Sequence, residues 1–334
     1  MAVSLEDFSK SKILVIGDIM LDCYLWGKVE RISPEAPVPI VQALKRTYMV
    51  GGAGNVALNL ASIGCKSDIV AICGKDRAAS QLKQMVDEHK IREHLIFDDA
   101  HLTITKTRVM ALEQQLLRID EERVQTLRDE LKEAILSKIE KMVKSYQVVI
   151  LSDYGKGFLK TPNITESIIS ICRAKGVAVL VDPKGRDWDR YKNATCVTPN
   201  SAELNLVANE IIDSDDELIE ASERIRKLYA LEWLLITRGA KGMCLTGRSR
   251  AEQGFNGGAS DNQTPLLIPT QARQVYDVSG AGDTVIAMLA AGLSVGLSFE
   301  DSARLANKAA GVVVGKVGTQ PITKDELNAI LISS

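Results

Sequence analysis

A glycine-rich segment near the C-terminus places a carboxylate at the start of an apolar run. It reads Asp277-Val-Ser-Gly-Ala-Gly-Asp283-Thr284, and the run that follows predicts a buried helix. The first backbone N–H groups of a helix lack partners within it, and with the helix dipole they can hold an anion. The amides of Gly280, Ala281 and Gly282 are therefore candidates for an anion hole. Asp283 could accept a proton from a hydroxyl while this hole stabilises a transferring phosphoryl group. The alternative is a tight turn followed by an ordinary helix-start carboxylate.

Polar residues also follow the short apolar runs that predict buried strands. They are Asp18, Asp22, Asp153, Lys156, Lys184, Asn200, Thr237 and Arg238. In open α/β sheets, ligands bind at the carboxyl ends of the strands. Turns favour Asp, Gly and Pro whatever their function, so any one of these positions could simply be a turn. Taken together, carboxylates mixed with lysine and arginine favour a site for a sugar and a phosphoryl group.

A second glycine-rich segment, Gly51-Gly-Ala-Gly-Asn-Val-Ala57, opens a predicted helix. Part of it matches a dinucleotide-binding pattern, but that pattern should follow the first buried strand directly, and here about thirty residues intervene. We interpret the glycines as letting the backbone approach a polyol, with Asn55 hydrogen-bonding it. Close helix packing is the alternative. The sequence contains no G-x-x-x-x-G-K-[ST] segment, which excludes a P-loop.

Composition excludes several other classes of protein. The 334 residues are 46% hydrophobic with a net charge of −2, so no global field attracts nucleic acid or an anionic membrane. The six cysteines are scattered without C-x-x-C spacing, and no secretory leader is apparent, so we expect buried thiols in a reducing cytoplasm. His89, His94 and His101 lie in a predicted surface helix and the turns after it, without cysteine or carboxylate at zinc-ligand spacing, so we expect them to be solvated or paired locally.

The elements that must position these residues alternate along the chain. Apolar runs at 12–16, 147–151, 177–181 and 233–236 predict strands buried on both faces. Helical periods occupy 55–63, 77–89, 129–145, 165–175, 216–229, 283–295, 299–315 and 324–332. Such alternation predicts parallel crossovers and a doubly wound, mostly parallel sheet flanked by helices.

Two segments break this alternation. Residues 23–50 and 103–120 alternate apolar and polar side chains, which predicts a small antiparallel sheet with one wet face. Such a sheet would form a lid, a dimer surface or both, within a single domain spanning residues 1–334. The Gly-rich segment 248–264 predicts an exposed hairpin loop.

The two glycine-rich segments together resemble the signatures of the ribokinase (phosphofructokinase-B) family of carbohydrate kinases, and the order of the predicted strands fits over essentially the whole chain. Within that family the sequence is most similar to the D-glycero-β-D-manno-heptose 7-phosphate kinases. The motifs that carry this similarity are GDIMLD at 17–22, RISPEAPVP at 31–39, LSDYGKG at 151–157, VDPKG at 181–185, TPN at 198–200, YDVSGAGDT at 276–284 and AGVVVGK at 310–316. Gly54 and Ser279 depart from the commoner Ala and Thr. The chain resembles a free-standing kinase, because the second, nucleotidyltransferase domain of many members is not in it.

The resemblance implies a role for each matched residue. Asp283 would be the base, with ATP and Mg²⁺ as cofactors and Glu203 organising the metal through water. The nucleotide would lie along Lys184, Asn200, Glu203, Thr237, Arg238, Gly239, Gly242, Ser279 and Asn307. Asp18, Asp22, Gly52, Asn55 and Asp153 would bind the sugar, and Lys106, Arg108 and Lys156 its phosphate. Lys106 and Arg108 share one strand face, but solvated strand charges would look the same. Glu203 could equally be a plain helix-start carboxylate.

The implied reaction is phosphorylation of the anomeric hydroxyl to give the 1,7-bisphosphate, a step toward ADP-heptose and the lipopolysaccharide core. The implied enzyme is cytoplasmic and dimerises through the lid. Two alternatives stay open. The acceptor could be another sugar, sugar phosphate or nucleoside, since the signatures do not separate these. The second alternative is a non-catalytic protein that senses a sugar or nucleotide. Such a protein would be expected to lack Asp283 or the glycines before it, and this sequence has all of them.

Overall fold

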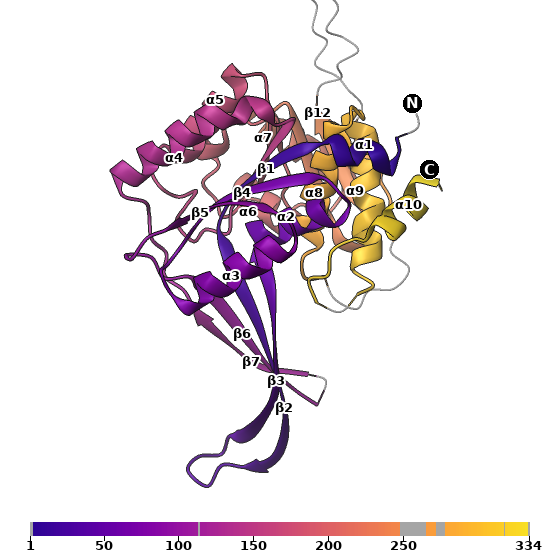
Figure 1. The fold of residues 1–334 in the computed structure, drawn as a ribbon. Coiled ribbons are helices and arrows are strands. Elements are labelled where there is room, and N and C mark those ends of the chain that lie inside the picture. The colour runs from indigo at the N-terminus through magenta and orange to yellow at the C-terminus, as the bar shows by residue number, and fades with distance from the viewer. Residues whose placement is uncertain (1–2, 113, 248–264, 272–277, 317, 333–334) are drawn as a thin grey trace, which may run out of the picture.

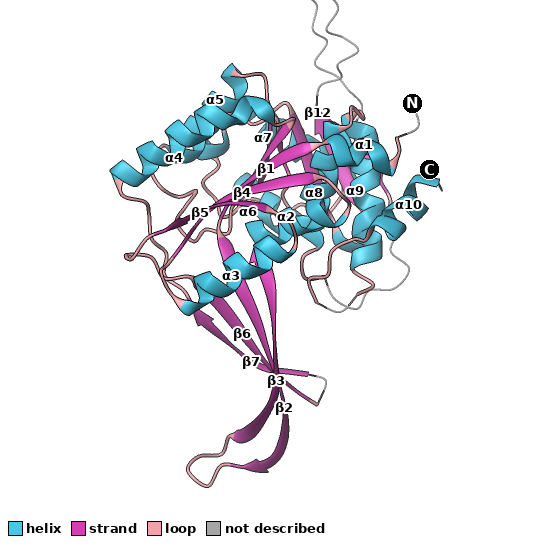
Figure 2. Cartoon of the chain, in the orientation of Figure 1, coloured by secondary structure: helices cyan, strands magenta, loops and turns pink. Residues whose placement is uncertain are grey.

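The computed structural model describes residues 3–112, 114–247, 265–271, 278–316 and 318–332 (Figure 1). The predicted loop at 248–264 and Asp277 lie outside the described residues. Helices sandwich a large central sheet, and a smaller sheet of long strands projects from one end of this body (Figure 2). The predicted doubly wound body with a β lid is therefore confirmed.

The large sheet follows the order β13-β12-β11-β10-β9-β8-β1-β4-β5. All neighbours from β11 to β5 run parallel, and only β12 and β13 at one edge are antiparallel. From β1 the chain proceeds first to β4 and β5 on one side, then to β8 on the other. The carboxyl ends of β1 and β8 thus flank a topological switch point, where α/β sheets bind ligands. The strands are β1 (Lys12–Gly17), β4 (Lys66–Cys73), β5 (Arg92–Phe97), β8 (Val148–Ser152), β9 (Ala178–Asp182), β10 (Cys196–Val197), β11 (Trp233–Thr237), β12 (Met243–Gly247) and β13 (Leu266–Ile268).

Two hydrophobic layers hold the helices on opposite faces of this sheet. Successive residues of β1 alternate between them: Ile13 and Val15 join one layer, Leu14 and Ile16 the other. Each such side chain contributes about 1.5–3 kcal/mol by leaving water. The first layer packs α1 (Leu5–Lys10), α2 (Ala53–Ser62), α3 (Arg77–Glu88), α8 (Ala281–Ser294), α9 (Phe299–Val313) and α10 (Lys324–Ile332). The second packs α4 (Asp129–Met142), α5 (Ile164–Ala174), α6 (Ser201–Ala208) and α7 (Asp215–Leu228). The eight predicted helices match these elements closely, and the short α1 and α6 were not predicted.

The lid is a four-stranded sheet in the order β3-β2-β6-β7. Its strands are β2 (Ile19–Ile32), β3 (Pro39–Gly52), β6 (Ile104–Ala111) and β7 (Gln114–Glu121). The two outer pairs are antiparallel as predicted, but the central β2–β6 pair is parallel. The prediction of a wholly antiparallel lid was wrong because residues 53–103 return the chain to the body before β6. The β2–β3 hairpin extends beyond the pairing with β6, which ends at Gly27 (Figure 1).

The cysteines are free and buried, as predicted. The prediction for His94 was wrong, because His94 lies within β5, near Asp68. His101 is paired locally, as predicted, with its Nδ1 2.9 Å from Asp98. The described residues hold no group of three His, Cys, Asp or Glu side chains arranged for a metal. None of the helices in the described part of the chain is long and apolar enough to span a membrane.

Candidate active site

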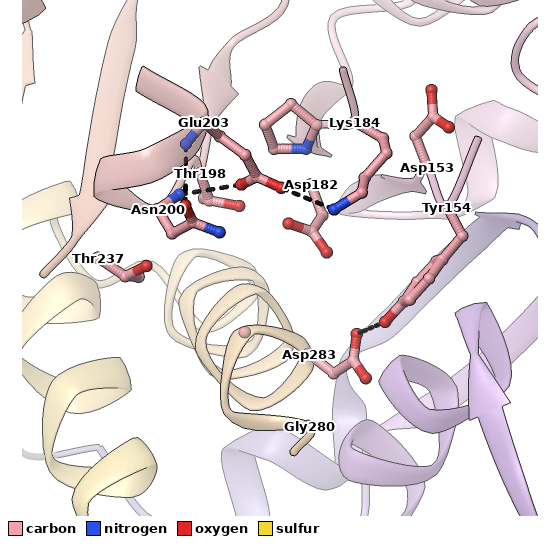
Figure 3. A pocket seen from close by; sticks show the side chains of 12 residues that line it. Asp153, Tyr154, Asp182, Lys184, Thr198, Asn200, Glu203, Thr237, Gly280 and Asp283 are labelled. Atoms are coloured by element: carbon pink, nitrogen blue, oxygen red, sulfur yellow. Dashed lines mark hydrogen bonds and ion pairs between the residues drawn. The ribbon is translucent and has the colours of Figure 1, made fainter. Parts of the chain in front are cut away.

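A cavity of about 180 Å³ lies at the carboxyl ends of the central strands, where α8 begins (Figure 3). Its walls come from the ends of β8, β9, β10 and β11 and from the first turn of α8. The lining residues are Asp153, Tyr154, Asp182, Pro183, Lys184, Thr198, Asn200, Glu203, Thr237, Gly280, Gly282 and Asp283. Most of these were predicted as site residues. A larger cavity of about 340 Å³ lies on the other side of the lid, against α3, and contains none of them.

The first turn of α8 has the geometry of an anion hole. Gly280 caps the helix with a φ of 78°, a left-handed conformation that favours glycine. The amide of Ala281 donates to the carbonyl of Val278 (3.2 Å), so this predicted member of the hole is already used. Within the described chain, the amides of Gly282 and Asp283 have no backbone acceptor. These two N–H groups are thus the ones available to an anion.

Asp283 is buried, and neither of its oxygens caps the helix. Oδ1 accepts a hydrogen bond from the hydroxyl of Tyr154 and Oδ2 accepts one from Nδ2 of Asn55, both at 2.7 Å (Figure 3 shows the Tyr154 bond). An ordinary helix-start carboxylate would bond to its own helix, so that alternative does not describe Asp283. Two side chains from other elements, α2 and the loop after β8, hold the carboxylate in place.

Burial raises the pKa of Asp283 to about 6, against the opposing effect of the two hydrogen bonds from Asn55 and Tyr154. The negative charge of Asp22 contributes to this rise. A carboxylate with such a pKa is mostly ionised at neutral pH yet basic enough to take a proton, as a general base requires.

This pKa predicts a pH dependence of turnover. Below about pH 6 Asp283 is protonated and cannot accept a proton, so kcat/KM should fall about tenfold per pH unit and level off above it. Tyr154→Phe removes a donor that stabilises the ionised form, so the midpoint should move to higher pH. Profiles of kcat/KM from about pH 5 to 8 with one acceptor measure the native midpoint and its shift in Tyr154→Phe. Titration of the acceptor itself affects the native enzyme and the variant alike. Tyr229→Phe, at the end of α7, is the control; an unmoved midpoint in Tyr154→Phe would contradict the assignment.

Asp22 lies on the lid strand β2, facing the cavity side. Its Oδ1 accepts a hydrogen bond of 2.5 Å from Nη1 of Arg108, whose guanidinium also lies over the ring of Tyr24. A Cβ on Gly51 would stand 2.2 Å from Oδ2 of Asp22, so glycine is required for β3 to pass this carboxylate. Arg108, predicted to bind phosphate, is therefore committed to Asp22.

Asp18 fixes the loop after β8. Its carboxylate accepts hydrogen bonds from the backbone amides of Tyr154 (3.2 Å), Lys156 (2.9 Å) and Phe158 (3.3 Å). Burial raises its pKa to about 6 although these bonds favour the ionised form. Asp18 therefore holds the loop that presents Tyr154 to Asp283, and its predicted contact with sugar stays a prediction.

The glycines of the first signature pack against protein. A Cβ on Gly52, which has a φ of 60°, would meet the carbonyl of Asp18 at 2.4 Å. A Cβ on Gly54 would meet Val50 at 2.1 Å. Close packing, the alternative interpretation of this segment, thus describes Gly52 and Gly54. Asn55 donates to Asp283 and carries a buried Oδ1 without a partner in the described chain.

Asn200 and Glu203 cap α6 reciprocally. The side chain of Asn200 accepts from the amide of Glu203 (2.9 Å), and Glu203 Oε2 accepts from the amide of Asn200 (3.1 Å). The helix-start role of Glu203 is therefore real, and its Oε1 also pairs with Lys184 at 3.1 Å (Figure 3). These side chains line the cavity opposite Asp283. Asp153 is fully engaged by Gly155 N (2.6 Å), Tyr191 (2.6 Å) and Arg190 (3.1 Å).

The remaining predicted nucleotide residues lie outside the cavity lining, apart from Thr237. Arg238 pairs with Asp215 at the start of α7, and its predicted place along a triphosphate stays a prediction. Gly239 and Gly242 belong to a 3₁₀ turn (η3, Gly239–Lys241) and its cap, both with positive φ. Ser279 lies in the turn before α8. Asn307 is buried on α9 and donates to the carbonyl of Pro269 (2.8 Å).

The predicted phosphate lysines meet at the junction of lid and body. Nζ of Lys156 lies 2.5 Å from Oε1 of Glu122, and Nζ of Lys106 lies 3.8 Å from Oε2 of the same residue. Lys106 is also 3.9 Å from Asp120. The structure thus brings the two lysines close to one carboxylate, Glu122, and the sequence did not predict a carboxylate at this position.

Four cavity residues had no predicted role: Tyr154, Asp182, Pro183 and Thr198. Tyr154 belongs to a segment that was singled out, but a tyrosine after a strand gives no sign that it will bond to a carboxylate 129 positions away. Asp182 and Thr198 follow strands in the same manner. The pKa of Asp182 is raised well above its ordinary value, first by burial and then by the charges of Asp283 and Glu203, so the protonated, neutral form of Asp182 is favoured beside these two carboxylates.

A mostly parallel sheet with a β lid, and a buried carboxylate beside free helix-start amides, define a carbohydrate kinase with the ribokinase-like fold. The arrangement matches solved structures over nearly their whole length. Arabidopsis thaliana ribokinase complexed with ribose and ATP has a TM-score of 0.72, with 18% identity over 96% of this chain and 98% of that one. Phosphofructokinase-2 from Escherichia coli in complex with potassium has a TM-score of 0.74, with 17% identity over 97% and 98%. At such identities the likeness shows the fold alone.

The chain belongs to the pfkB family of carbohydrate kinases, whose model matches residues 10–326. Membership of a kinase family implies the use of ATP. Among curated relatives, the bifunctional protein HldE of Actinobacillus pleuropneumoniae serotype 5b (strain L20) is 43% identical over 324 residues, 97% of this chain. That of Proteus mirabilis (strain HI4320) is 43% identical over 331 residues, 99% of this chain. The chain spans 64% and 66% of the lengths of these two relatives.

Proposed function

We propose that this sugar kinase transfers the γ-phosphoryl group of ATP to the anomeric hydroxyl of D-glycero-β-D-manno-heptose 7-phosphate. The observation that carries the proposal is Asp283, buried at the start of α8 between Asn55 and Tyr154, with two unpaired amides beside it. The similarity of seven sequence motifs to heptose 7-phosphate kinases supports this acceptor. So does the 43% identity to bifunctional proteins HldE over almost the whole chain.

The proposed acceptor would extend from Asp283 past Asp22 to the two lysines at the junction of lid and body. Asp283 stands at one end, where it would take the proton of the attacking hydroxyl. Asp22 follows, close enough for its charge to act on both Asp283 and Tyr154. Lys106 is opposite Asp22 in the register of β2 with β6. At the other end of the proposed acceptor, Lys106 and Lys156 both lie near Glu122. An acceptor with its reacting hydroxyl at Asp283 would thus place a terminal phosphate at the two lysines.

The protein contributes positioning and charge stabilisation to the transfer, since phosphoryl transfer needs little covalent chemistry from a protein. The amides of Gly282 and Asp283 would stabilise the charge on the transferring group. Lys184, Asn200 and Thr237 line the opposite wall and would hold the triphosphate. The lid would exclude water and so limit wasteful hydrolysis of ATP.

Mg²⁺ fits the chemistry of this wall. Carboxylate oxygens are its preferred protein ligands, and it commonly keeps several waters. Glu203 and Asp182 supply such oxygens. Burial and, after it, the charges of Asp283 and Glu203 raise the pKa of Asp182, and a nearby cation would oppose both effects. Glu203 would hold the metal through water beside the nucleotide phosphates. When bound, Mg²⁺ would neutralise charge on those phosphates.

We also propose that two copies pair through the outer face of the lid. On β7, Leu117 and Ile119 are opposite Val109 and Thr107, on the face turned away from Lys106 and Arg108. They are 49% and 50% exposed, which is unusual for neighbouring large apolar side chains on one sheet face. Sedimentation of the full chain would show a monomer at micromolar concentration if this pairing is wrong.

With ATP as donor, the enzyme would act in the cytoplasm.

A panel of acceptors tests the function. ADP release should be fastest with D-glycero-β-D-manno-heptose 7-phosphate, and at least about tenfold slower, in kcat/KM, with ribose, fructose 6-phosphate, adenosine and the unphosphorylated heptose. The product should be identified by ³¹P NMR as a 1,7-bisphosphate. Preference for another acceptor would refute the assigned substrate while leaving a kinase. No ADP release with any acceptor would favour the non-catalytic alternative.

A further inference from the structure

The carboxylate of Glu122 occupies the place between the two lysines at the junction of lid and body. Glu122 directly follows β7, so it belongs to the lid, whereas Lys156 belongs to the loop after β8. Oε1 of Glu122 is 2.5 Å from Nζ of Lys156. Oε2 is buried, has no hydrogen-bond partner in the described chain, and lies 3.8 Å from Nζ of Lys106. One carboxylate thus lies within reach of two ammonium groups.

These charges are shielded from water. The side chains of Lys106, Lys156 and Glu122 are 14%, 17% and 24% exposed, so their mutual attraction is screened less than that of surface pairs. Two partly buried ammonium groups without an anion would be costly, because each loses hydration. Glu122 supplies that anion, but only a single negative charge for two positive ones.

The neighbouring acids have other partners. Both oxygens of Asp120 accept from Arg118, at 2.7 Å and 2.9 Å, so Asp120 is satisfied without Lys106. Asp22 is bonded to Arg108. Glu122 has no hydrogen bond in the described chain except the one from Lys156. Of the acids around the lysines, Glu122 is therefore the one that a stronger anion can displace.

We propose that, in the free enzyme, the carboxylate of Glu122 occupies the position of the acceptor's phosphate. When the acceptor binds, its phosphomonoester dianion displaces this carboxylate from the two lysines. The inference rests on the proposed function, since it requires a phosphorylated acceptor at this end of the site. A phosphate carries about −2 at neutral pH and three acceptor oxygens, so it satisfies Lys106 and Lys156 together better than one carboxylate does.

The exchange explains selectivity for a phosphorylated sugar. An unphosphorylated sugar brings no charge to displace Glu122, which then stays in the space a phosphate would fill. Binding of the phosphate also replaces the direct Lys156–Glu122 contact between body and lid with one made through the substrate. Glu122 is thus a specificity-determining residue that makes no contact with the reacting atoms.

Calorimetric titration of the full chain with inorganic phosphate, without nucleotide or sugar, tests the exchange. Glu122→Gln keeps the shape of the side chain but removes its charge, so inorganic phosphate should bind about five- to tenfold more tightly than to the native protein. The KM for a phosphorylated acceptor should fall in parallel, while that for its unphosphorylated analogue should not. Asp120→Asn, two positions earlier at the end of β7, is the matched control, and it should change phosphate affinity less than about twofold because Arg118 already neutralises Asp120.

A second variant separates the exchange from a general change in charge. Adding Lys106→Ala to Glu122→Gln removes one of the two cations, so the gain in phosphate affinity should disappear. An unchanged affinity in Glu122→Gln, or an equal gain in Asp120→Asn, would overturn the proposal. Its failure is distinct from failure of the proposed function: the acceptor panel reports which sugar is phosphorylated, whereas the titration reports only what displaces Glu122.

Discussion

Asp283→Asn should lower kcat by about 10³-fold while leaving the affinities for ATP and sugar within a few-fold of the native values. An amide has nearly the shape of the carboxylate but cannot take the proton of the attacking hydroxyl, and general-base catalysis contributes about 10²–10⁴-fold. The backbone amides at positions 282 and 283 remain in place, so residual turnover is expected. Steady-state rates with calorimetric binding of each substrate measure the two effects separately. Near-native turnover would contradict the role of Asp283.

The same variant should not be less stable than the native protein at neutral pH. The pKa of Asp283 is about 6 in the fold against 3.8 as the reference value, so the folded state favours its protonated form. Stability therefore falls as the pH rises from about 4 to about 6, and the ionised group costs about 3 kcal/mol above that range. The neutral side-chain amide of the variant lacks this cost, although it also loses charge-assisted hydrogen bonds. Thermal melts at about pH 5 and pH 7.5 should show the variant's relative stability rising with pH. A loss of both activity and stability would point to misfolding instead.

Gly280→Ala should lower kcat by about 10²-fold. A Cβ there would lie 2.9 Å from Nδ2 of Asn55, the group that bonds to Asp283, so Asn55 must move. A displacement of about 1 Å at a catalytic group can cost about 10²-fold. The left-handed backbone at Gly280 adds about 1–2 kcal/mol of strain. Rates and melting temperatures together measure these two consequences.

Gly296→Ala provides the matched control for the strain. Gly296 also has a positive φ, 87°, but a Cβ there meets nothing within 4 Å, and it lies beyond the opposite end of α8. Gly296→Ala should therefore lower stability by a similar amount without lowering kcat. If both variants reduce turnover equally, the loss in Gly280→Ala comes from strain in the helix and the proposed contact with Asn55 is irrelevant.

The fold could be predicted from periodicity because the same physical pattern repeats along the chain. Continuous apolar runs such as that of β8 are buried on both faces, and helices such as α3 and α7 bury one apolar stripe each. The fold predictions failed where contacts between distant segments determine which strands pair. The parallel pairing of β2 with β6 depends on the return of residues 53–103 through the body, which no local pattern records.

The site could be predicted only in part for the same reason. Asp283 was found because glycines before a helix leave a local signature of free amides. Tyr154 and Asn55 reach it from positions 129 and 228 residues earlier, and the sequence holds no sign of these contacts. The pairing of Arg238 with Asp215 was likewise not predicted, since a charged side chain takes whichever partner the fold brings near.

The long β2–β3 hairpin offers an exposed position for a fluorescent label on the same strands that carry Asp22. β2 runs unbroken from Ile19, beside Asp18, through Asp22 to Ile32, and β3 returns from Pro39 to Gly52 at the start of α2. The turn between them is exposed, and the protein's own thiols are all buried. A single cysteine introduced at Glu35 could therefore be coupled selectively to a fluorophore. Because β2 also carries Asp22, which we propose lies beside the acceptor, a change in its emission on adding acceptor would report binding without any label at the site itself.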